Sequence, residues 1–246
     1  MALLVLTLPT PEGLSSEAHR TAAIFLLMGT WWATEAVPVA VTALVPLALF
    51  PLLGIVDIQS AANPYANKIV YLFLGGFLIA TAIQKWNLHK RIALFVLNNA
   101  GSNGASLILG FMVTAAVISM WVMNTATTIM LLPIGLAVIT VVKETVKGLS
   151  EKETENFQLA LLLGIAYGAT IGGMSTLIGT GPNGMLAAFM ADNYGLDISF
   201  VDWMKVGVPL SAFMLPCSCF IITKLIFKVN FDTSSEPSFA FIQPIT

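Results

Sequence analysis

The chain contains apolar runs that are too long to be single membrane helices, and each run is interrupted once by polar residues. Residues 105–142 are apolar apart from isolated Ser and Thr residues and the cluster "MNTATT" at 123–128, and residues 21–55 are apolar apart from isolated Thr residues and "TEAVP" at 34–38. At 1.5 Å per residue, one helix over 105–142 would be about 57 Å long, whereas the hydrocarbon core of a membrane is roughly 30 Å thick. We therefore expect each run to reverse direction at its polar interruption.

The first half of the chain is expected to hold three spans and one surface helix. Glu35 and Pro38 mark the first reversal, because a charge and a proline are tolerated best at the membrane interface. Residues 85–101 start with a cluster of basic side chains and continue as an amphipathic stretch, which is typical of a helix that lies on the membrane surface. The three expected spans cover residues 21–34, 38–54 and 68–84.

The second half is expected to hold a hairpin, a broken helix and a final span. Residues 105–142 are predicted to form a re-entrant helical hairpin with "MNTATT" at its tip, because irregular backbone at membrane depth is tolerated only where it lines a cavity or is buried in protein. Residues 157–190 repeat the pattern as a broken transmembrane helix, with a break rich in Gly, Ser and Thr. The last span covers 204–227, and residues 231–246 form a polar linker or tail. The predicted fold class is an all-α integral membrane protein.

The composition supports a membrane protein and excludes other classes. Of the 246 residues, 57% are hydrophobic and 10% are charged, and the mean hydropathy is +0.87. Soluble domains carry about 25% charged residues, so this chain cannot cover a globule with a polar surface. The charges lie in short connecting segments and form no basic face, which argues against a nucleic-acid partner. No carboxylate pair lies in a predicted span, so we expect no enzyme active site.

The basic residues predict the orientation of the chain in the membrane. If 105–142 is re-entrant, the basic clusters fall on one side, and the opposite segment, 191–203, carries three aspartates and no Lys or Arg. We expect a multi-pass protein of the plasma membrane with its basic side inside. The first span then starts outside, so "MALLVLTL" at residues 1–8 is interpreted as the remnant of a truncated helix. The clustered basic residues are Lys85, Lys90, Arg91, Lys143, Lys147, Lys152, Lys224 and Lys228.

Two interrupted helices in one membrane protein are the strongest indication of a transport site in a sequence. At each break a helix N-terminus offers free N–H groups to an anion, and a helix C-terminus offers free carbonyls to a cation. In the first break Asn124 is interpreted as the cap of the second arm. In the second break one arm is expected to end near Gly179 and the next to start at Pro182. The alternative interpretation is that these residues stabilise the fold and bind nothing. Ser and Thr in membrane helices often form hydrogen bonds to their own backbone, and glycines such as those of "GATIGG" often serve helix packing.

Several of these segments resemble the divalent anion:sodium symporter family, the dicarboxylate and citrate transporters that include the INDY proteins. The resemblance covers nearly the whole chain and lies in "WWATEAVPVAVTALVPLALFPLLGI", "LFLGGFLIATAIQKWNLHKRIAL", "SMWVMNTATTIMLLPIG", "IAYGATIGGMSTLIGTGPN" and "DWMKVGVPL". It implies a sodium-coupled carrier built from two inverted repeats, which works as a homodimer with a transport domain that moves like an elevator. Residues 1–104 would belong to the scaffold domain and residues 105–230 to the transport domain.

The resemblance also implies a set of binding residues. The Ser-Asn-Thr motif of the family's hairpin tip corresponds to Met123, Asn124 and Thr125 here. Asn124 and Thr125 would contact a substrate carboxylate, and we expect Thr180 and Gly181, at the start of the second arm, to join them. The coupling Na⁺ would be held by Ser119, Met123, Asn124 and Gly179, of which Met123 and Gly179 contribute their backbone.

Two departures from the family pattern change the expectation. Methionine at position 123 removes a hydroxyl that the family offers to sodium and substrate, which leaves the ion dependence open. No second Ser-Asn-Thr hairpin follows up to Thr246, so we expect the N-terminal half of a carrier that is inactive without its C-terminal repeat. The alternatives are a non-transporting membrane partner derived from a half-carrier, a half-size carrier that pairs with a second copy, and a sulfate carrier or a sodium-independent anion exchanger.

Overall fold

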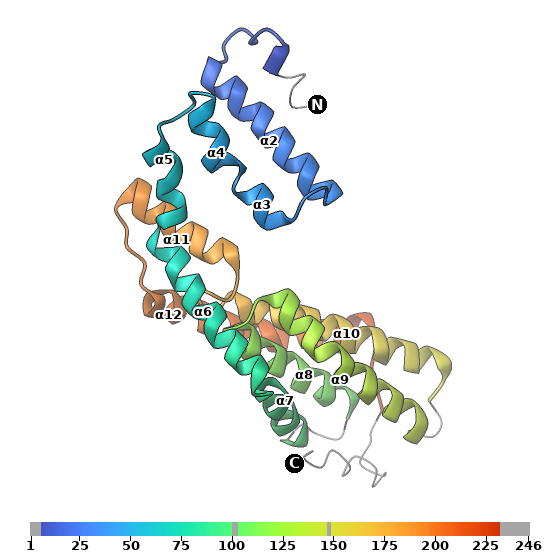
Figure 1. Cartoon of the computed structure of the whole chain (residues 1–246). Helices are drawn as coiled ribbons and strands as arrows, with labels where there is room; N and C mark the ends of the chain where they lie inside the picture. Colours follow the sequence, from blue (N-terminus) through green and yellow to red (C-terminus); the bar gives the residue numbers. More distant parts are fainter. Residues whose placement is uncertain (1–5, 100–102, 147–148, 232–246) are drawn as a thin grey trace. The chain divides into compact units, whose positions relative to one another are not determined.

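The computed structural model describes residues 6–99, 103–146 and 149–231, and within these ranges every regular element is a helix. The chain divides into two compact units, residues 1–70 and 71–246 (Figure 1). The all-helical expectation is confirmed for the described residues, and four of their helical stretches are long and apolar enough, by length and composition, to cross a membrane. They are Ile58–Lys85, Asn124–Thr145, Glu151–Gly173 and Phe200–Ile226.

In the first unit the chain reverses where the sequence predicts. α2 (Ser16–Thr34) ends at Glu35, which adopts a left-handed conformation with φ of 49°. The chain then returns along α2 as α3 (Val39–Ala43) and α4 (Val45–Leu52). Arg20, in the first turn of α2, donates a hydrogen bond of 2.6 Å to a backbone carbonyl at the end of α4 and so fastens the far end of this hairpin.

The predicted span 38–54 is not a single helix. Leu44 separates α3 from α4, because Pro46 has no N–H with which to continue the helical hydrogen bonds. The apolar stretch Val39–Leu52 is shorter than the candidate spans, and α2 is not among them either, because its first turn is polar. The elements that follow are α5 (Ile58–Ala62), capped by Asp57, then η1 (Asn63–Ala66) and α6 (Lys68–Lys85).

The basic stretch after α6 forms a separate short helix, as predicted. Asn87 adopts a left-handed conformation with φ of 50°, which ends α6 and turns the chain into α7 (Leu88–Asn99). The position of α7 on a membrane surface stays a prediction.

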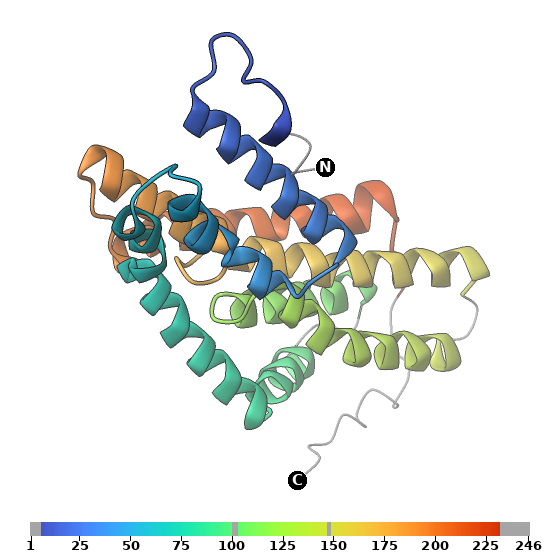
Figure 2. The same cartoon turned by 45° about the horizontal axis from the view of Figure 1, so that its top comes forward.

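The core of the second unit is the contact between α8 (Gly104–Ser119) and α10 (Glu151–Gly173), which run side by side in Figures 1 and 2. A Cβ on Gly168 would lie 2.6 Å from a backbone oxygen of α8, and a Cβ on Gly172 would overlap the Ala116 carbonyl. The two helices therefore pack backbone against backbone. The glycines of "GATIGG" serve this packing, as the structural interpretation predicted.

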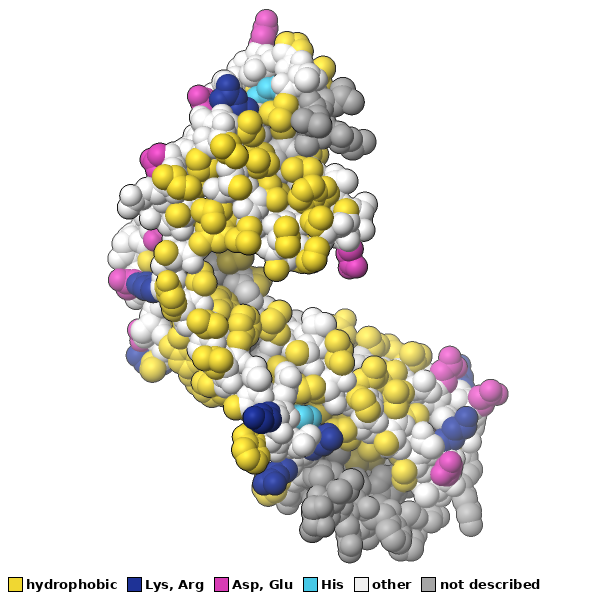
Figure 3. Space-filling view, in the orientation of Figure 1, with side chains coloured by type: hydrophobic (Ala, Val, Ile, Leu, Met, Phe, Trp, Pro, Cys, Tyr) yellow, Lys and Arg dark blue, Asp and Glu magenta, His cyan; other side chains and the backbone are white. Residues whose placement is uncertain are grey.

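On the outer surface of the second unit, apolar and charged side chains are distributed as in a membrane protein. Hydrophobic side chains cover much of the visible face between the helix ends, where the charged side chains gather (Figure 3). On α9 (Asn124–Thr145) the exposed side chains include Ile129, Leu132 and Leu136.

The unit is completed by α11 (Gly181–Tyr194) and by α12 (Phe200–Phe220), which continues as the π-helical η2 (Ile221–Ile226).

Both predicted interruptions are present. α8 ends at Ser119 and α9 begins at Asn124, so residues 105–142 are two helices. α10 ends at Gly173 and α11 begins at Gly181. The expected end of the first arm near Gly179 is wrong, because the chain leaves the helix at Met174, whose N–H turns back to the Ile171 carbonyl. The insertion of the α8–α9 hairpin into a membrane as a re-entrant element stays a prediction.

Candidate functional site

The turn between α8 and α9 is held by side chains from both of its ends. Ser119 is fully buried and donates a hydrogen bond of 2.8 Å from Oγ to Asn124 Oδ1. Thr127, in the first turns of α9, is also buried and donates from Oγ1 to the Val122 carbonyl at 3.4 Å. These bonds close residues 120–123 into a compact turn.

The N-cap of α9 is Met123 and not Asn124. Met123 has φ of −53° and ψ of 142°, outside the helical region, and no side chain caps the helix. The methionine side chain is 51% exposed and has no hydroxyl, so the first N–H groups of α9 lack a side-chain acceptor. The Met123 carbonyl accepts the Thr127 N–H at 2.9 Å. The expectation that Asn124 caps this arm is therefore wrong, because its side-chain oxygen bonds to Ser119 instead.

The loop between α10 and α11 is built around two buried polar side chains. Thr176 donates from Oγ1 to the Met120 carbonyl at 2.6 Å, and the same oxygen accepts the Gly179 N–H at 3.0 Å. Asn183 donates from Nδ2 to the Gly173 carbonyl at 2.9 Å and to the Thr176 carbonyl at 2.7 Å. The loop is thereby fastened to the hairpin turn on one side and to α11 on the other.

The hairpin turn and the loop meet at two buried glycines. A Cβ on Gly173 would overlap Asn124 Oδ1. A Cβ on Gly179 would overlap the Gly173 carbonyl oxygen and would lie 2.9 Å from the Ser119 carbonyl oxygen. The structure therefore brings together Ser119, Asn124 and Gly179, three of the four residues predicted to hold sodium, and adds Gly173 to them.

The oxygen atoms that lie at this junction are uncharged and are hard ligands. They are the Ser119 hydroxyl and carbonyl, the Asn124 amide oxygen and the Gly173 carbonyl. Carbonyl oxygens suit hard cations, and the unwound ends of broken helices supply such oxygens to Na⁺ in transporters. Among the residues that the structure describes, no three His, Cys, Asp or Glu side chains are grouped to hold a metal ion. A set of neutral oxygens of this kind suits a monovalent cation.

The residues predicted to bind substrate lie at the N-termini of α9 and α11. Thr125 is exposed in the first turn of α9. Thr180 is the N-cap of α11 but makes no side-chain capping bond, and Gly181 is exposed, with nothing within 4 Å of the place where its Cβ would be. Both helices therefore begin without a side-chain cap. The first N–H groups of α9 lack a side-chain acceptor and can bind an anion at the positive end of the helix dipole. α11 offers the Gly181 N–H for this purpose, because Pro182 has no N–H and the Asn183 N–H donates to the Thr180 carbonyl at 3.2 Å.

Sequence reasoning missed two residues of this junction, Gly173 and Thr176. Thr176 is one of several hydroxyl residues in "GGMSTLIGTGPN", and its partner Met120 lies 56 residues away, so no local pattern distinguishes it. Trp203 was missed for the same reason, although its Nε1 donates to the Met174 carbonyl at 2.9 Å and holds the start of the loop against α12.

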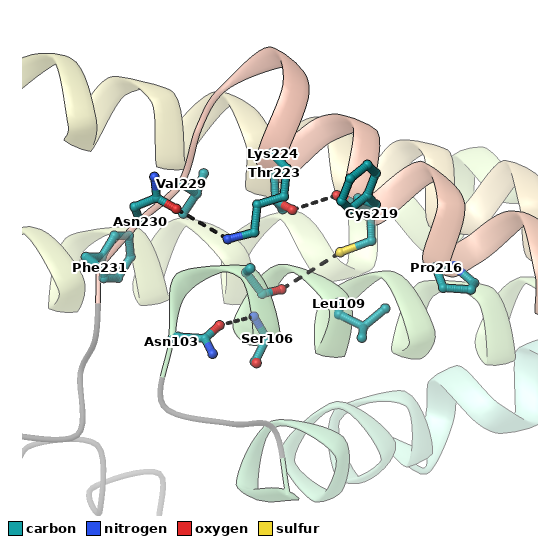
Figure 4. Close-up of a pocket in the computed structure, with 12 residues that line it drawn as sticks. Asn103, Ser106, Leu109, Pro216, Cys219, Thr223, Lys224, Val229, Asn230 and Phe231 are labelled. Atoms are coloured by element: carbon teal, nitrogen blue, oxygen red, sulfur yellow. Dashed lines mark hydrogen bonds between the residues drawn. The ribbon is translucent and has the colours of Figure 1, made fainter.

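A hollow of about 620 Å³ lies at the end of α8 opposite to the junction (Figure 4). There Lys224 Nζ donates to Asn230 Oδ1 at 3.3 Å. α8 has 16 residues, so its two ends are about 24 Å apart and this hollow is separate from the junction at Ser119. None of the predicted site residues lines it. Its lining residues are Asn103, Ala105, Ser106, Leu109, Pro216, Cys219, Phe220, Thr223, Lys224, Val229, Asn230 and Phe231.

Comparison with known proteins gives consistent matches over most of the chain. The family described as "Sodium:sulfate symporter transmembrane region" matches residues 1–240. The sodium-dependent dicarboxylate transporter SdcS of Staphylococcus saprophyticus is 40% identical over 232 residues, which cover 94% of this chain and 45% of that protein. The transporter of the same name from Staphylococcus aureus is 41% identical over 208 residues, which cover 84% of this chain and 40% of that protein. The chain thus spans about half the length of the curated relatives that it matches.

Proposed function

Because the chain belongs to the sodium:sulfate symporter family, we propose that it forms one half of a sodium-coupled carrier of dicarboxylates such as succinate or citrate. The family is the one that the sequence motifs indicate, and it is a family of transporters and not of enzymes. The relatives named as sodium-dependent dicarboxylate transporters support the choice of ion and of substrate class.

The observation that carries the proposal is the junction of Ser119, Asn124 and Gly179. The three residues come from the end of α8, the start of α9 and the α10–α11 loop, and they meet where the sequence has its two polar interruptions. In our proposal, Na⁺ binds to the neutral oxygens of this junction. The Met123 carbonyl is also available to the ion, because a carbonyl that accepts one N–H keeps a second lone pair.

One substrate carboxylate would bind at the uncapped helix N-termini beside this ion. The first N–H groups of α9, the N–H of Gly181 at the start of α11 and the hydroxyls of Thr125 and Thr180 supply donors to an anion. A bound Na⁺ lowers the electrostatic penalty of bringing a dianion to this region, which accounts for coupling between ion and substrate. The second carboxylate requires partners outside this set.

The complete carrier would combine this chain with a C-terminal repeat of inverted topology. We place residues 1–104 in a scaffold domain and residues 105–230 in a transport domain, with the α8–α9 hairpin re-entrant. The predicted linker, residues 231–246, lies outside the described residues except for Phe231. The complete protein would be a homodimer in the plasma membrane that works by an elevator movement. The support for this assignment is that the chain matches less than half of each relative's length.

The proposal is tested with a chimera that joins residues 1–230 to the C-terminal half of the Staphylococcus saprophyticus transporter. Reconstituted in liposomes, the chimera should accumulate labelled succinate when an inward sodium gradient is applied and not when potassium replaces sodium. Uptake of labelled sulfate and citrate is measured in parallel, so that transport of an anion other than succinate is detected. Uptake without sodium would make the protein an exchanger, and no uptake of any dianion by a folded chimera would favour a non-transporting membrane partner.

The chain without a C-terminal half is the matched control. Residues 1–246 in liposomes should show no concentrative uptake, because alternating access needs elements of both repeats. Sodium-dependent accumulation by this chain would instead support a half-size carrier that pairs with a second copy.

A further inference from the structure

We infer that Thr176 is a positioning residue of the sodium site, whose hydroxyl couples the α10–α11 loop to the hairpin turn and holds Gly179 against Ser119. The identity of the ion rests on the proposed function, whereas the coupling of the two segments does not.

The geometry of one hydroxyl carries the inference. Thr176 Oγ1 donates to the Met120 carbonyl at 2.6 Å and accepts the Gly179 N–H at 3.0 Å. A threonine hydroxyl has one hydrogen and two lone pairs, so both bonds form at the same time. Thr176 is fully buried, and the two segments that it joins are 56 residues apart in the sequence.

The backbone of Thr176 is held as firmly as its side chain. Asn183 donates one amide hydrogen to the Thr176 carbonyl and the other to the Gly173 carbonyl. Gly179 has no side chain with which to fix its own place, so its position beside the Ser119 carbonyl depends on the bond that its N–H makes to Thr176.

The link should therefore act on ion binding and not on folding alone. Ser119 and Asn124 belong to the hairpin, whereas Gly173 and Gly179 belong to the broken helix, so a cation between them must hold two segments together. A preformed link removes part of the entropy cost of ordering these segments when the ion binds. By thermodynamic reciprocity, the bound ion should in turn protect both segments from local opening.

The test is amide hydrogen exchange of the 246-residue chain in lipid nanodiscs, with choline or with increasing sodium at constant ionic strength. Thr176→Val keeps the shape of the side chain and removes the hydroxyl, and Thr176→Ser keeps the hydroxyl. Thr176→Ala is a second variant without a hydroxyl, smaller than valine, in case valine does not fit. Thr170→Val is the matched control, because Thr170 is exposed on α10, just before the loop, and donates to the Ala166 carbonyl of its own helix, at 3.0 Å.

In choline, loss of the hydroxyl should speed exchange about tenfold in the loop 174–180 and also in the hairpin turn 120–123, whereas Thr176→Ser and Thr170→Val should exchange like the wild type. With sodium, the wild-type chain should become protected in both segments. The sodium concentration for half-maximal protection should rise by about tenfold or more when the hydroxyl is absent.

Faster exchange confined to 174–180, with the hairpin turn and the sodium midpoint unchanged, would overturn the inference and leave Thr176 as a local turn residue. A wild-type chain without any response to sodium would reject the proposed ion site and the positioning role with it. The choline samples alone still decide whether Thr176 couples the two segments, so the two failures are distinguishable.

Discussion

Ser119, the last residue of α8, donates a hydrogen bond of 2.8 Å from its hydroxyl to the side-chain oxygen of Asn124, the first residue of α9. The bond sets two neutral oxygens side by side next to Gly173. A cation that takes the Asn124 oxygen displaces the Ser119 hydrogen. The Val122 carbonyl, 3.3 Å from the same hydroxyl, is then the acceptor for that hydrogen. The hairpin can therefore exchange an internal hydrogen bond for an ion without leaving a buried donor unpaired.

Asn124→Ala should remove sodium binding and transport while the chain stays folded. Loss of the amide oxygen removes one ligand of the ion, at about 1–3 kcal/mol, whereas the Ser119 hydroxyl keeps the Val122 carbonyl as an acceptor. Sodium affinity should fall by about 10- to 100-fold, and succinate uptake by the chimera should be abolished. Asn193→Ala is the control, because Asn193 is exposed and donates to a carbonyl of its own helix. Wild-type uptake by Asn124→Ala would refute the site assignment.

Met123→Ser should stabilise the hairpin. Serine at an N-cap accepts a first-turn N–H that methionine leaves without a side-chain acceptor, which contributes about 1 kcal/mol. The unfolding temperature should rise by about 2–4 °C in a chain of this size. Met185→Ser is the control, because Met185 is exposed within α11, away from the N-cap position. Unchanged or lower thermal stability of Met123→Ser would contradict the capping argument.

Gly172→Ala should separate α8 from α10. The added Cβ would overlap the Ala116 carbonyl, and relief of that overlap requires a shift of backbone, which destabilises by about 1–3 kcal/mol or more. Gly75→Ala, in α6, is the matched control, because nothing lies within 4 Å of its Cβ position and alanine is the better helix former by up to about 1 kcal/mol. The unfolding temperature in detergent should therefore fall for Gly172→Ala and rise for Gly75→Ala. An equal shift of the unfolding temperature in both variants would argue against backbone packing between α8 and α10.

Sodium binding should not depend on pH near neutrality. The oxygens of the junction belong to a hydroxyl, an amide and backbone carbonyls, none of which titrates there. The sodium midpoint measured at pH 6 and at pH 8 should agree within about twofold. A tenfold change between these two values would mean that an ionisable group takes part in the site.

The positions of the two breaks could be predicted because membrane thickness limits helix length. Residues 105–142 cannot cross as one helix, and "MNTATT" is the one cluster of polar residues in that run, whose other Ser and Thr residues are isolated. The reversal at Glu35 follows from the same reasoning. The break at Leu44 has a local signal in Pro46, which the continuous apolar pattern of 38–54 obscures.

The end of α10 and the role of Thr176 could not be predicted, because distant contacts decide them. Glycines occur at 172, 173 and 179, and composition does not say which of them ends the helix. The helix ends at Gly173, where the Asn124 side chain comes too close for any residue with a Cβ. The hydrogen bond between Ser119 and Asn124 could not be predicted either. Because Asn124 accepts this bond, its side chain does not cap α9 as the sequence pattern suggested.

The most direct test is equilibrium binding of radioactive sodium to the purified 246-residue chain in nanodiscs, compared with Gly179→Ala and Gly75→Ala. The added methyl of Gly179→Ala would intrude on the Gly173 and Ser119 carbonyl oxygens, whereas the methyl of Gly75→Ala, in α6, enters open space. Saturable sodium binding is expected for the wild type and for Gly75→Ala, and none for a folded Gly179→Ala. Wild-type binding by Gly179→Ala, or no saturable binding by the wild type, would contradict this expectation.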